Sequence, residues 1–149
     1  MDEKQSQAID AIARNCIAVR VRQLNRVITN LYDDALRPLR LKISQLNVLV
    51  AAAKLGLAQP TKLCEILQMD ASTVSRNVDR MRAKGWLEIV SGEDGRTQPF
   101  RLTPRGTRLL EKAIPAWARA QHRAAELLGP DGVAAVATTA RKLAVQAIP

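Results

Sequence analysis

The 149-residue chain has few of the side chains that support metal binding or catalysis. It contains one histidine, His122, and two cysteines, Cys16 and Cys64, which do not form a Cys-x-x-Cys pair. Transition-metal sites require clustered Cys, His and carboxylate ligands, and a serine or cysteine nucleophile requires a base beside it. A glycine-rich nucleotide-binding loop is also absent from the sequence. We therefore expect no metal site, no cofactor and no enzymatic activity.

Long apolar runs are missing too. No stretch reaches the roughly 18 apolar residues that a membrane-spanning helix requires. The first residues, MDEKQSQ, are acidic and polar, whereas a signal peptide opens with a basic segment followed by an apolar one. The sequence therefore predicts a cytoplasmic protein without a membrane span.

Positive charge, by contrast, is in excess. The chain has 23 Lys and Arg residues against 14 Asp and Glu residues, which gives a net charge of +9, and its pI is about 10.4. An excess of arginine in such a chain indicates a polyanionic partner, such as nucleic acid or an anionic membrane surface. The length fits one domain, or two small ones that share helices.

The most informative stretch is DASTVSRNVDRMRAKGWLE, residues 70–88. Asp70 can cap a helix, Val74, Val78 and Met81 form one apolar stripe, and Gly85 supplies a left-handed stop. The other faces carry hydroxyls, one amide and basic groups: Ser72, Thr73, Ser75, Arg76, Asn77, Arg80, Arg82 and Lys84. Such groups bond to base edges and phosphates in a major groove, although the helix alone also fits a solvated amphipathic surface helix.

The flanking segments favour the first interpretation. Residues 60–67 form a second short helix that Pro60 can open, and Gln68-Met69 is a tight connection between the two. Residues 86–90 predict a strand, 91–96 a turn and 97–102 a returning strand. Two helices joined by a short turn and followed by a hairpin form a winged helix-turn-helix.

The N-terminal part predicts two further helices. Apolar residues follow one helical face over 6–36, and Pro38 ends this helix. At 1.5 Å per residue it would be roughly 45 Å long, too long to bury its apolar face within so small a domain. We therefore expect a second subunit to cover that face. Ser44 is expected to cap a helix over 45–55, with Leu46, Leu49, Val50 and Ala53 facing inward and Gly56 as its stop.

The C-terminal part predicts a second pair of long helices. Thr103-Pro104 combines a threonine cap with proline at the first helical position. Pro115 should kink this helix, and Gly129-Pro130 should end it. An alanine-rich helix over 131–147 follows. Together with the N-terminal helix it would form a dimerisation platform of residues 1–43 and 104–149 around a DNA-binding domain of residues 44–103.

These features resemble the MarR family of bacterial transcriptional regulators. STVSRNVDRMRAKGWLE resembles its recognition helix and first wing strand, and EDGRTQPFRLTPRG resembles its wing, with Asp94, Arg96, Leu102, Thr103 and Gly106 in the expected places. The resemblance implies a mainly α-helical, homodimeric winged helix-turn-helix with a small β-hairpin wing. It also implies a transcription regulator, more often a repressor, that binds palindromic double-stranded DNA and has no membrane partner.

The expected DNA contacts lie on the central helix and the wing. We expect five residues to reach bases or nearby phosphates: Ser72, Thr73, Ser75, Arg76 and Asn77. Arg80, Arg82 and Lys84 lie nearer the end of the helix, where we expect contacts with phosphates only, or with solvent. A thin hairpin can present Arg96 to the narrow minor groove, where the negative potential favours arginine. Asp94 could hold its guanidinium through a charge-assisted hydrogen bond; the alternative for this pair is a weak surface ion pair.

Two further expectations concern regulation. In some family members a cysteine near the start of the first helix senses peroxides, which makes Cys16 a candidate. Its place on an apolar face, however, favours an inert small hydrophobic residue. Relatives bind phenolic acids between platform and DNA-binding lobe, so Trp117 could line an effector cavity or simply pack. The rival interpretation of the whole chain is a winged-helix adaptor that binds protein instead of DNA.

Overall fold

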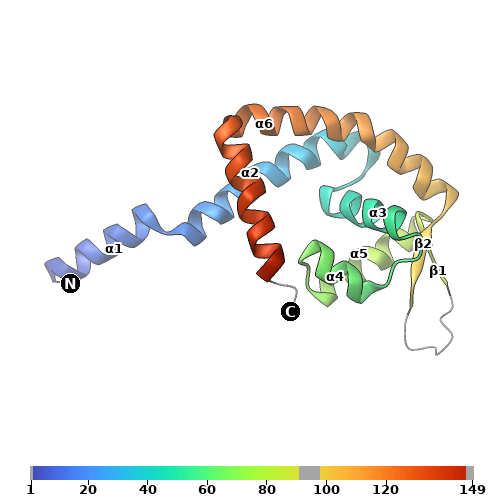
Figure 1. The fold of residues 1–149 in the computed structure, drawn as a ribbon, viewed down its shortest axis with the longest axis horizontal. Helices are drawn as coiled ribbons and strands as arrows, with labels where there is room; N and C mark the ends of the chain where they lie inside the picture. The colour runs from blue at the N-terminus through green and yellow to red at the C-terminus, as the bar shows by residue number, and fades with distance from the viewer. Residues whose placement is uncertain (1, 91–97, 147–149) are drawn as a thin grey trace.

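The computed structural model describes residues 2–90 and 98–146. It is mainly α-helical, as predicted, with one two-stranded antiparallel sheet. The elements are α1 (Glu3–Asn15), α2 (Ile17–Leu36), the 3-10 turn η1 (Arg37–Leu39), α3 (Ile43–Leu55), α4 (Pro60–Leu67), α5 (Ala71–Ala83), β1 (Leu87–Ile89), β2 (Phe100–Leu102) and α6 (Pro104–Gln146). In Figure 1, α2 and α6 lie along one side of the molecule, with α3, α4, α5 and the sheet beneath them.

The single helix predicted over 6–36 is wrong, because the structure breaks it at Cys16. Cys16 has extended backbone angles, φ −64° and ψ 111°, and separates α1 from α2. No residue of α1 is buried, and Figure 1 shows this helix projecting away from the rest of the chain. Cysteine and the β-branched Ile17 are weak helix formers, and no packing within the chain offsets that weakness here. The helix end at Leu36, just before Pro38, agrees with the prediction.

The start of α3 also differs from expectation. The cap is Lys42, not Ser44, which lies inside the first turn. The Lys42 N–H donates to the Gln45 side-chain oxygen (3.2 Å), and the Ile43 N–H donates to an Asp33 carboxylate oxygen from α2 (2.8 Å). A distant carboxylate therefore satisfies the free backbone donors that a local serine was expected to satisfy.

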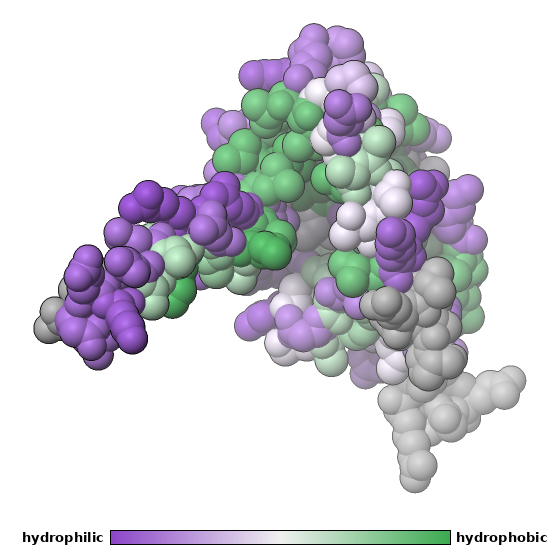
Figure 2. All heavy atoms as spheres, turned by 60° about the vertical axis from the view of Figure 1, so that its left-hand side comes forward, coloured by the Kyte–Doolittle hydropathy of each residue, from purple (hydrophilic) through white to green (hydrophobic). Residues whose placement is uncertain are grey.

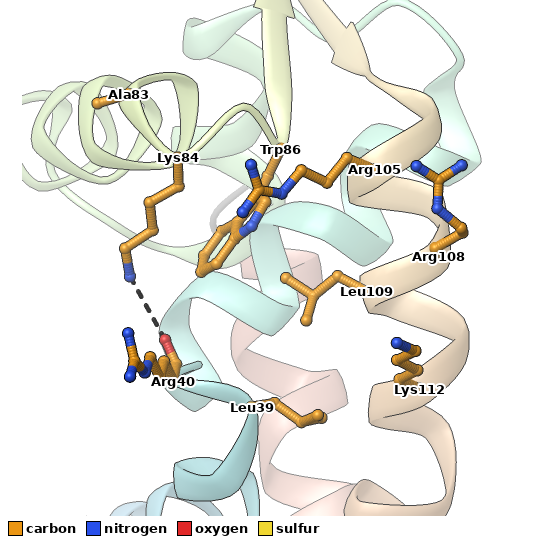
Figure 3. A pocket seen from close by; sticks show the side chains of 9 residues that line it. All are labelled: Leu39, Arg40, Ala83, Lys84, Trp86, Arg105, Arg108, Leu109 and Lys112. Carbon is orange, nitrogen blue, oxygen red and sulfur yellow. Dashed lines mark hydrogen bonds between the residues drawn. The ribbon is translucent and has the colours of Figure 1, made fainter.

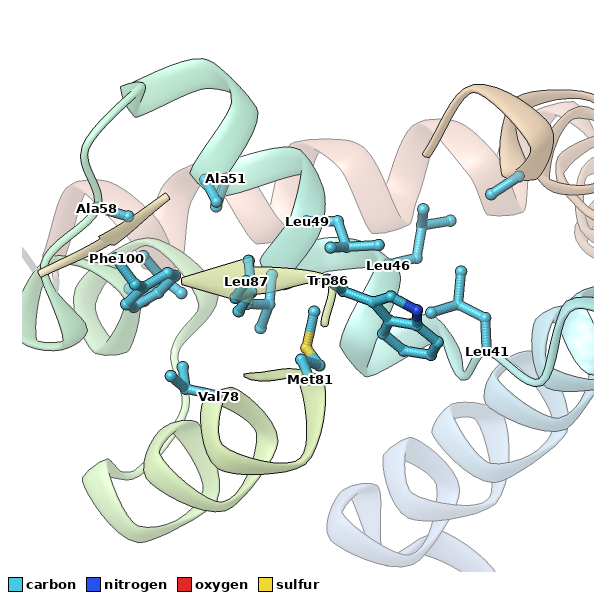
Figure 4. Packing of buried hydrophobic residues seen from close by; sticks show 14 of the residues in the cluster. Leu41, Leu46, Leu49, Ala51, Ala58, Val78, Met81, Trp86, Leu87 and Phe100 are labelled. Atoms are coloured by element: carbon cyan, nitrogen blue, oxygen red, sulfur yellow. The ribbon is translucent and has the colours of Figure 1, made fainter. Parts of the chain in front are cut away.

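The main core lies between α3, α5 and the sheet. Val74, Val78 and Met81 are buried, as the stripe predicted, and they pack with Leu87 and Phe100 (Figure 4). On α3, the predicted Leu46 and Leu49 are buried, whereas Val50 and Ala53 are exposed. Val48 and Ala52 take their places in the core, because the β2 strand and α5 cover a face rotated from the one expected.

The hairpin strands are shorter than predicted. β1 pairs with β2 in the register Leu87↔Leu102, Glu88↔Arg101 and Ile89↔Phe100. The Arg101 Nε lies 2.6 Å from a Glu88 carboxylate oxygen across this pair. The wing tip, with Asp94 and Arg96, falls outside the described residues.

The α6 helix begins and bends where the sequence predicted. The Gly106 N–H donates to the Thr103 hydroxyl oxygen (3.0 Å), so Thr103 caps the helix ahead of Pro104. Gly129 has non-helical angles, φ 68° and ψ 168°, and the segment after it turns away from the first part of α6 (Figure 1). Pro115 lies inside α6 and keeps helical backbone angles.

A second, smaller cluster joins the long helices. Tyr32 of α2 is buried with Ala120 and Ala124 of α6, and its hydroxyl donates to the Gln121 side-chain oxygen. Burial raises the pKa of the Tyr32 hydroxyl. Among the helices of residues 2–90 and 98–146, none is both long and apolar enough to cross a bilayer.

Candidate nucleic-acid interface

The start of α5 is organised by Asp70. Its carboxylate accepts from the Thr73 N–H (2.8 Å), the Ser72 hydroxyl (2.5 Å) and the Thr73 hydroxyl (2.6 Å). These hydrogen bonds hold the pKa of the Asp70 carboxyl well below its usual range, and the bond from Ser72 contributes most. The Ser72 and Thr73 hydroxyl protons are thereby engaged, so toward any further partner these two oxygens can act only as hydrogen-bond acceptors.

Arg76 is connected to the same group. Its Nη2 lies 3.4 Å from the Thr73 hydroxyl oxygen, which in turn donates to Asp70. The chain Asp70–Thr73–Arg76 directs an exposed guanidinium along the outer side of α5. Ser75 and Arg80 are exposed on that helix as well, so the helix presents the donors and acceptors that base edges and phosphates require.

Asn77 does not belong to the exposed set. The prediction placed it on the solvent side, but its side chain is only 8% exposed. It lies on the side of α5 that faces α3, where Gln45 is buried as well. Four residues separate Asn77 from Met81 and three from Val74, so its position is close to the apolar stripe, and packing of α3 covers it. We therefore leave Asn77 out of the DNA-facing residues.

A basic hollow lies between α3 and α5. It has a volume of about 550 Å³, and its basic lining residues are Arg40, Lys42, Arg76, Arg80 and Lys84. No carboxylate is among the described residues that line it. Sequence reasoning missed Arg40 and Lys42, which are distant from the central helix in the chain. The only available signal was their basic character just ahead of a predicted helix.

The end of α5 is fixed to the start of α6 by backbone contacts. The Thr103 N–H donates to the Trp86 carbonyl oxygen (3.1 Å), and the Thr103 hydroxyl donates to the Gly85 carbonyl oxygen (2.7 Å). A Cβ at Gly106 would lie 2.1 Å from the Trp86 carbonyl oxygen, so only glycine fits there. Gly85 has a φ of 71°, which confirms the predicted left-handed stop of the helix.

Neither cysteine forms part of this interface. Cys16 is half-buried at the α1–α2 break, and the Arg20 guanidinium beyond it donates to the Arg14 carbonyl oxygen. Cys64 is half-buried against the main core. Within the described part of the chain, no group of three or more His, Cys, Asp or Glu side chains could hold a metal ion.

The architecture defines the class of protein. Short helices α4 and α5 are joined by a tight turn in which Gln68 is left-handed (φ 50°), α3 supports them, and a hairpin follows. α5 packs its apolar stripe inward and exposes basic and hydroxyl groups outward. This arrangement is a winged helix-turn-helix.

Comparison with known proteins shows a similarity to the MarR family. Residues 40–97 match the model of the MarR family. The multiple antibiotic resistance protein MarR of Salmonella typhimurium is 30% identical over 90 residues, which cover 60% of this chain and 62% of that protein. The chain therefore aligns with less than two thirds of the length of that relative.

Two regulators solved in complex with DNA have the same fold. A mutant MarR of E. coli complexed with operator DNA has a TM-score of 0.78 at 21% identity and covers 93% of this chain and 98% of that one. The M. tuberculosis transcriptional regulator MOSR in complex with DNA has a TM-score of 0.75 at 26% identity, over 87% of this chain and 96% of that one. The chain is therefore similar to the MarR family of winged helix-turn-helix transcriptional regulators: residues 40–97 match the family model, and the fold is that of the solved regulators.

Proposed function

We propose that this protein is a DNA-binding repressor of transcription that acts as a homodimer on a palindromic site. The observation that carries the proposal is the outer side of α5, where the Asp70–Thr73–Arg76 chain directs a guanidinium outward beside a hollow lined by basic residues. The relatives solved with DNA support it. A protein-binding adaptor has no evident need for such a surface.

In the proposed complex, α5 enters the major groove. Arg76 and Arg80 reach base edges or phosphates, Ser75 bonds to either, and the Ser72 and Thr73 oxygens accept hydrogen bonds from base amino groups. Arg40 and Lys42 meet phosphates beside the groove. Arg96, supported by Asp94, would extend the contact into the adjacent minor groove from the wing.

An effector site is favoured by a separate observation. An apolar hollow of about 330 Å³ lies between α3 and α6 and is lined by Leu46, Asn47, Val50, Leu110, Ile114 and Trp117. Its single amide among apolar side chains suits a small aromatic effector such as a phenolic acid. A ligand that binds one spacing of the two DNA-binding lobes better than another would shift the dimer toward that spacing. Half-sites about 34–36 Å apart accept only some spacings, so a ligand that favours a different spacing would release DNA.

The proposal is tested by selecting duplexes from a random pool with the full chain. We expect enrichment of a palindrome and an affinity that falls by orders of magnitude between about 50 and 200 mM salt, because bound phosphates release counterions. Repeating the selection with an oxidant, for the parent and for Cys16→Ser, asks whether Cys16 acts as a redox sensor. Failure to retain any duplex, or an affinity independent of salt, would favour the adaptor interpretation.

A further inference from the structure

A second basic hollow lies where α5, η1 and α6 meet. It has a volume of about 480 Å³ and is bordered by Arg40, Lys84, Arg105, Arg108 and Lys112. Figure 3 shows these side chains around Trp86 and Leu109: Lys84 comes from the end of α5, Arg40 from the turn after η1, and the other three from the first turns of α6. The hollow shares Arg40 and Lys84 with the one beside the outer side of α5.

The backbone holds these cations near one another. The close approach of Gly106 to Trp86 and the Thr103 hydrogen bonds fix the start of α6 against the end of α5. Lys84 Nζ lies 4.4 Å from the centre of the Trp86 ring and 3.4 Å from the Arg40 carbonyl oxygen. Arg40 itself adopts a left-handed conformation, with φ 53° and ψ 35°.

Among the residues that the structure describes, the charges in this hollow have no acidic counterpart. No carboxylate is among its described lining residues. Across residues 2–90 and 98–146, none of the five cations lies within ion-pair distance of an acidic side chain. Like charges gathered in one hollow repel, and a bound anion of more than one charge would relieve that repulsion. Arginine guanidinium groups match the oxygen geometry of phosphate in pairs of hydrogen bonds.

We propose that this hollow is a phosphate-binding site, separate from the apolar hollow. The two are lined by different faces of α6, since Arg105, Arg108 and Lys112 border one, and Leu110, Ile114 and Trp117 border the other. The phosphate groups come either from a free phosphorylated small molecule or from a DNA backbone that continues past α5. A bound phosphate would join the DNA-reading helix to η1 and α6. Only the DNA source depends on the function proposed above.

The first arm of the test measures free phosphate. Inorganic pyrophosphate is titrated calorimetrically into the full chain at fixed ionic strength and without DNA. We expect binding that weakens at least tenfold in the double variant Arg105→Gln, Arg108→Gln. The matched control is Arg119→Gln, Arg123→Gln, which removes two exposed arginines of the same helix outside the hollow. All variants should melt at the temperature of the parent.

The second arm measures DNA phosphate. The slope of log affinity against log salt is determined on one selected duplex, and each phosphate contact contributes about 0.9 to it. If the DNA backbone occupies the hollow, loss of two phosphate contacts in the double variant reduces the magnitude of this negative slope by about 1.8 per protomer. The control variant leaves the slope unchanged. Pyrophosphate binding with no duplex bound at all would sustain the inference while removing the proposed function. The inference is overturned if the double variant equals its control in both arms.

Discussion

Asp70 has the strongest set of local hydrogen bonds at the start of α5. It accepts three of them within its own helical turn and, through Thr73, connects to Arg76. The residue thus has two effects: it stabilises the first turn of the helix, and it orients a side chain proposed to read DNA. Both depend on its negative charge, because an ionised carboxylate accepts hydrogen bonds more strongly than a neutral group.

Acid should weaken this cap. The pKa of Asp70 is lowered in the folded state, whereas the pKa of an aspartate in an unfolded chain is about 3.9. The stabilisation is therefore complete above the unfolded pKa and declines as pH falls below it toward the folded pKa. Urea unfolding of the parent and of Asp70→Asn is measured from pH 7 to pH 2. The difference between their free energies of unfolding should shrink below about pH 4. A difference that is constant over this pH range would contradict the conclusion that the ionised Asp70 carboxylate stabilises the helix.

Arg76→Ala should reduce DNA affinity and blur base preference. If Arg76 bonds a guanine, discrimination at one position per half-site should fall by about 1–3 kcal/mol. Arg82→Ala is the matched control, because Arg82 is exposed on the same helix but lies outside the basic hollow. Binding to a selected palindrome and its single-base variants gives the measurement. Equal behaviour of the two variants would exclude base recognition by Arg76.

At the scale of elements, α3 shows how a neighbouring helix can replace a local cap. Its first free N–H groups bond to Asp33 of α2 and to its own Gln45. This contact also fixes where α2 ends relative to α3, and so it connects the proposed platform to the DNA-binding lobe.

Asp33→Ala should therefore cost more stability than Ser44→Ala. We expect a loss of about 1 kcal/mol for Asp33→Ala, which is typical of a lost helix cap. For Ser44→Ala we expect less than about 0.5 kcal/mol, as for a surface position. Thermal or urea unfolding of both variants decides between them. The reverse order would restore Ser44 as the effective cap.

At the scale of the molecule, apolar side chains remain uncovered on the long helices. Large examples are Ile12, Ile17, Val21, Val27, Val136 and Leu143, each more than a third exposed. Figure 2 shows apolar surface where the α1–α2 arm meets the body and on the upper body. Contiguous exposed apolar surface marks protein interfaces. We therefore retain the proposal that residues 1–43 and 104–149 form a dimer platform.

The chain should sediment as a dimer at low micromolar concentration. The double variant Val21→Glu, Val27→Glu places charges on the uncovered side of α2 and should shift the protein to monomer, with a lower melting temperature. Ile66→Glu is the control, because Ile66 is also exposed but lies on α4, away from the long helices. If the parent sediments as a well-folded monomer, the proposed dimer platform is wrong. Regulation through the spacing of two DNA-binding lobes is then excluded as well.

The sequence by itself determined the features that depend on near neighbours along the chain. The Asp70 cap, the Gly85 stop, the Thr103 cap and the Gly129 break all follow from groups within a few residues of one another. The stripe of Val74, Val78 and Met81 likewise follows from helical spacing. These signals placed α4, α5 and the hairpin in order, and with them the winged helix-turn-helix and the residues at its outer surface.

Only the tertiary structure decided which faces other elements cover. Burial of Asn77 depends on how α3 crosses α5, and capping by Asp33 depends on a contact between residues ten positions apart. Arg40 and Lys84 meet across a sequence separation of 44, which no periodicity encodes. The break at Cys16 likewise reflects packing that α1 does not find within its own chain. Spacing along a helix decides which side chains share a face. Whether that face is buried depends on the neighbouring element that packs against it.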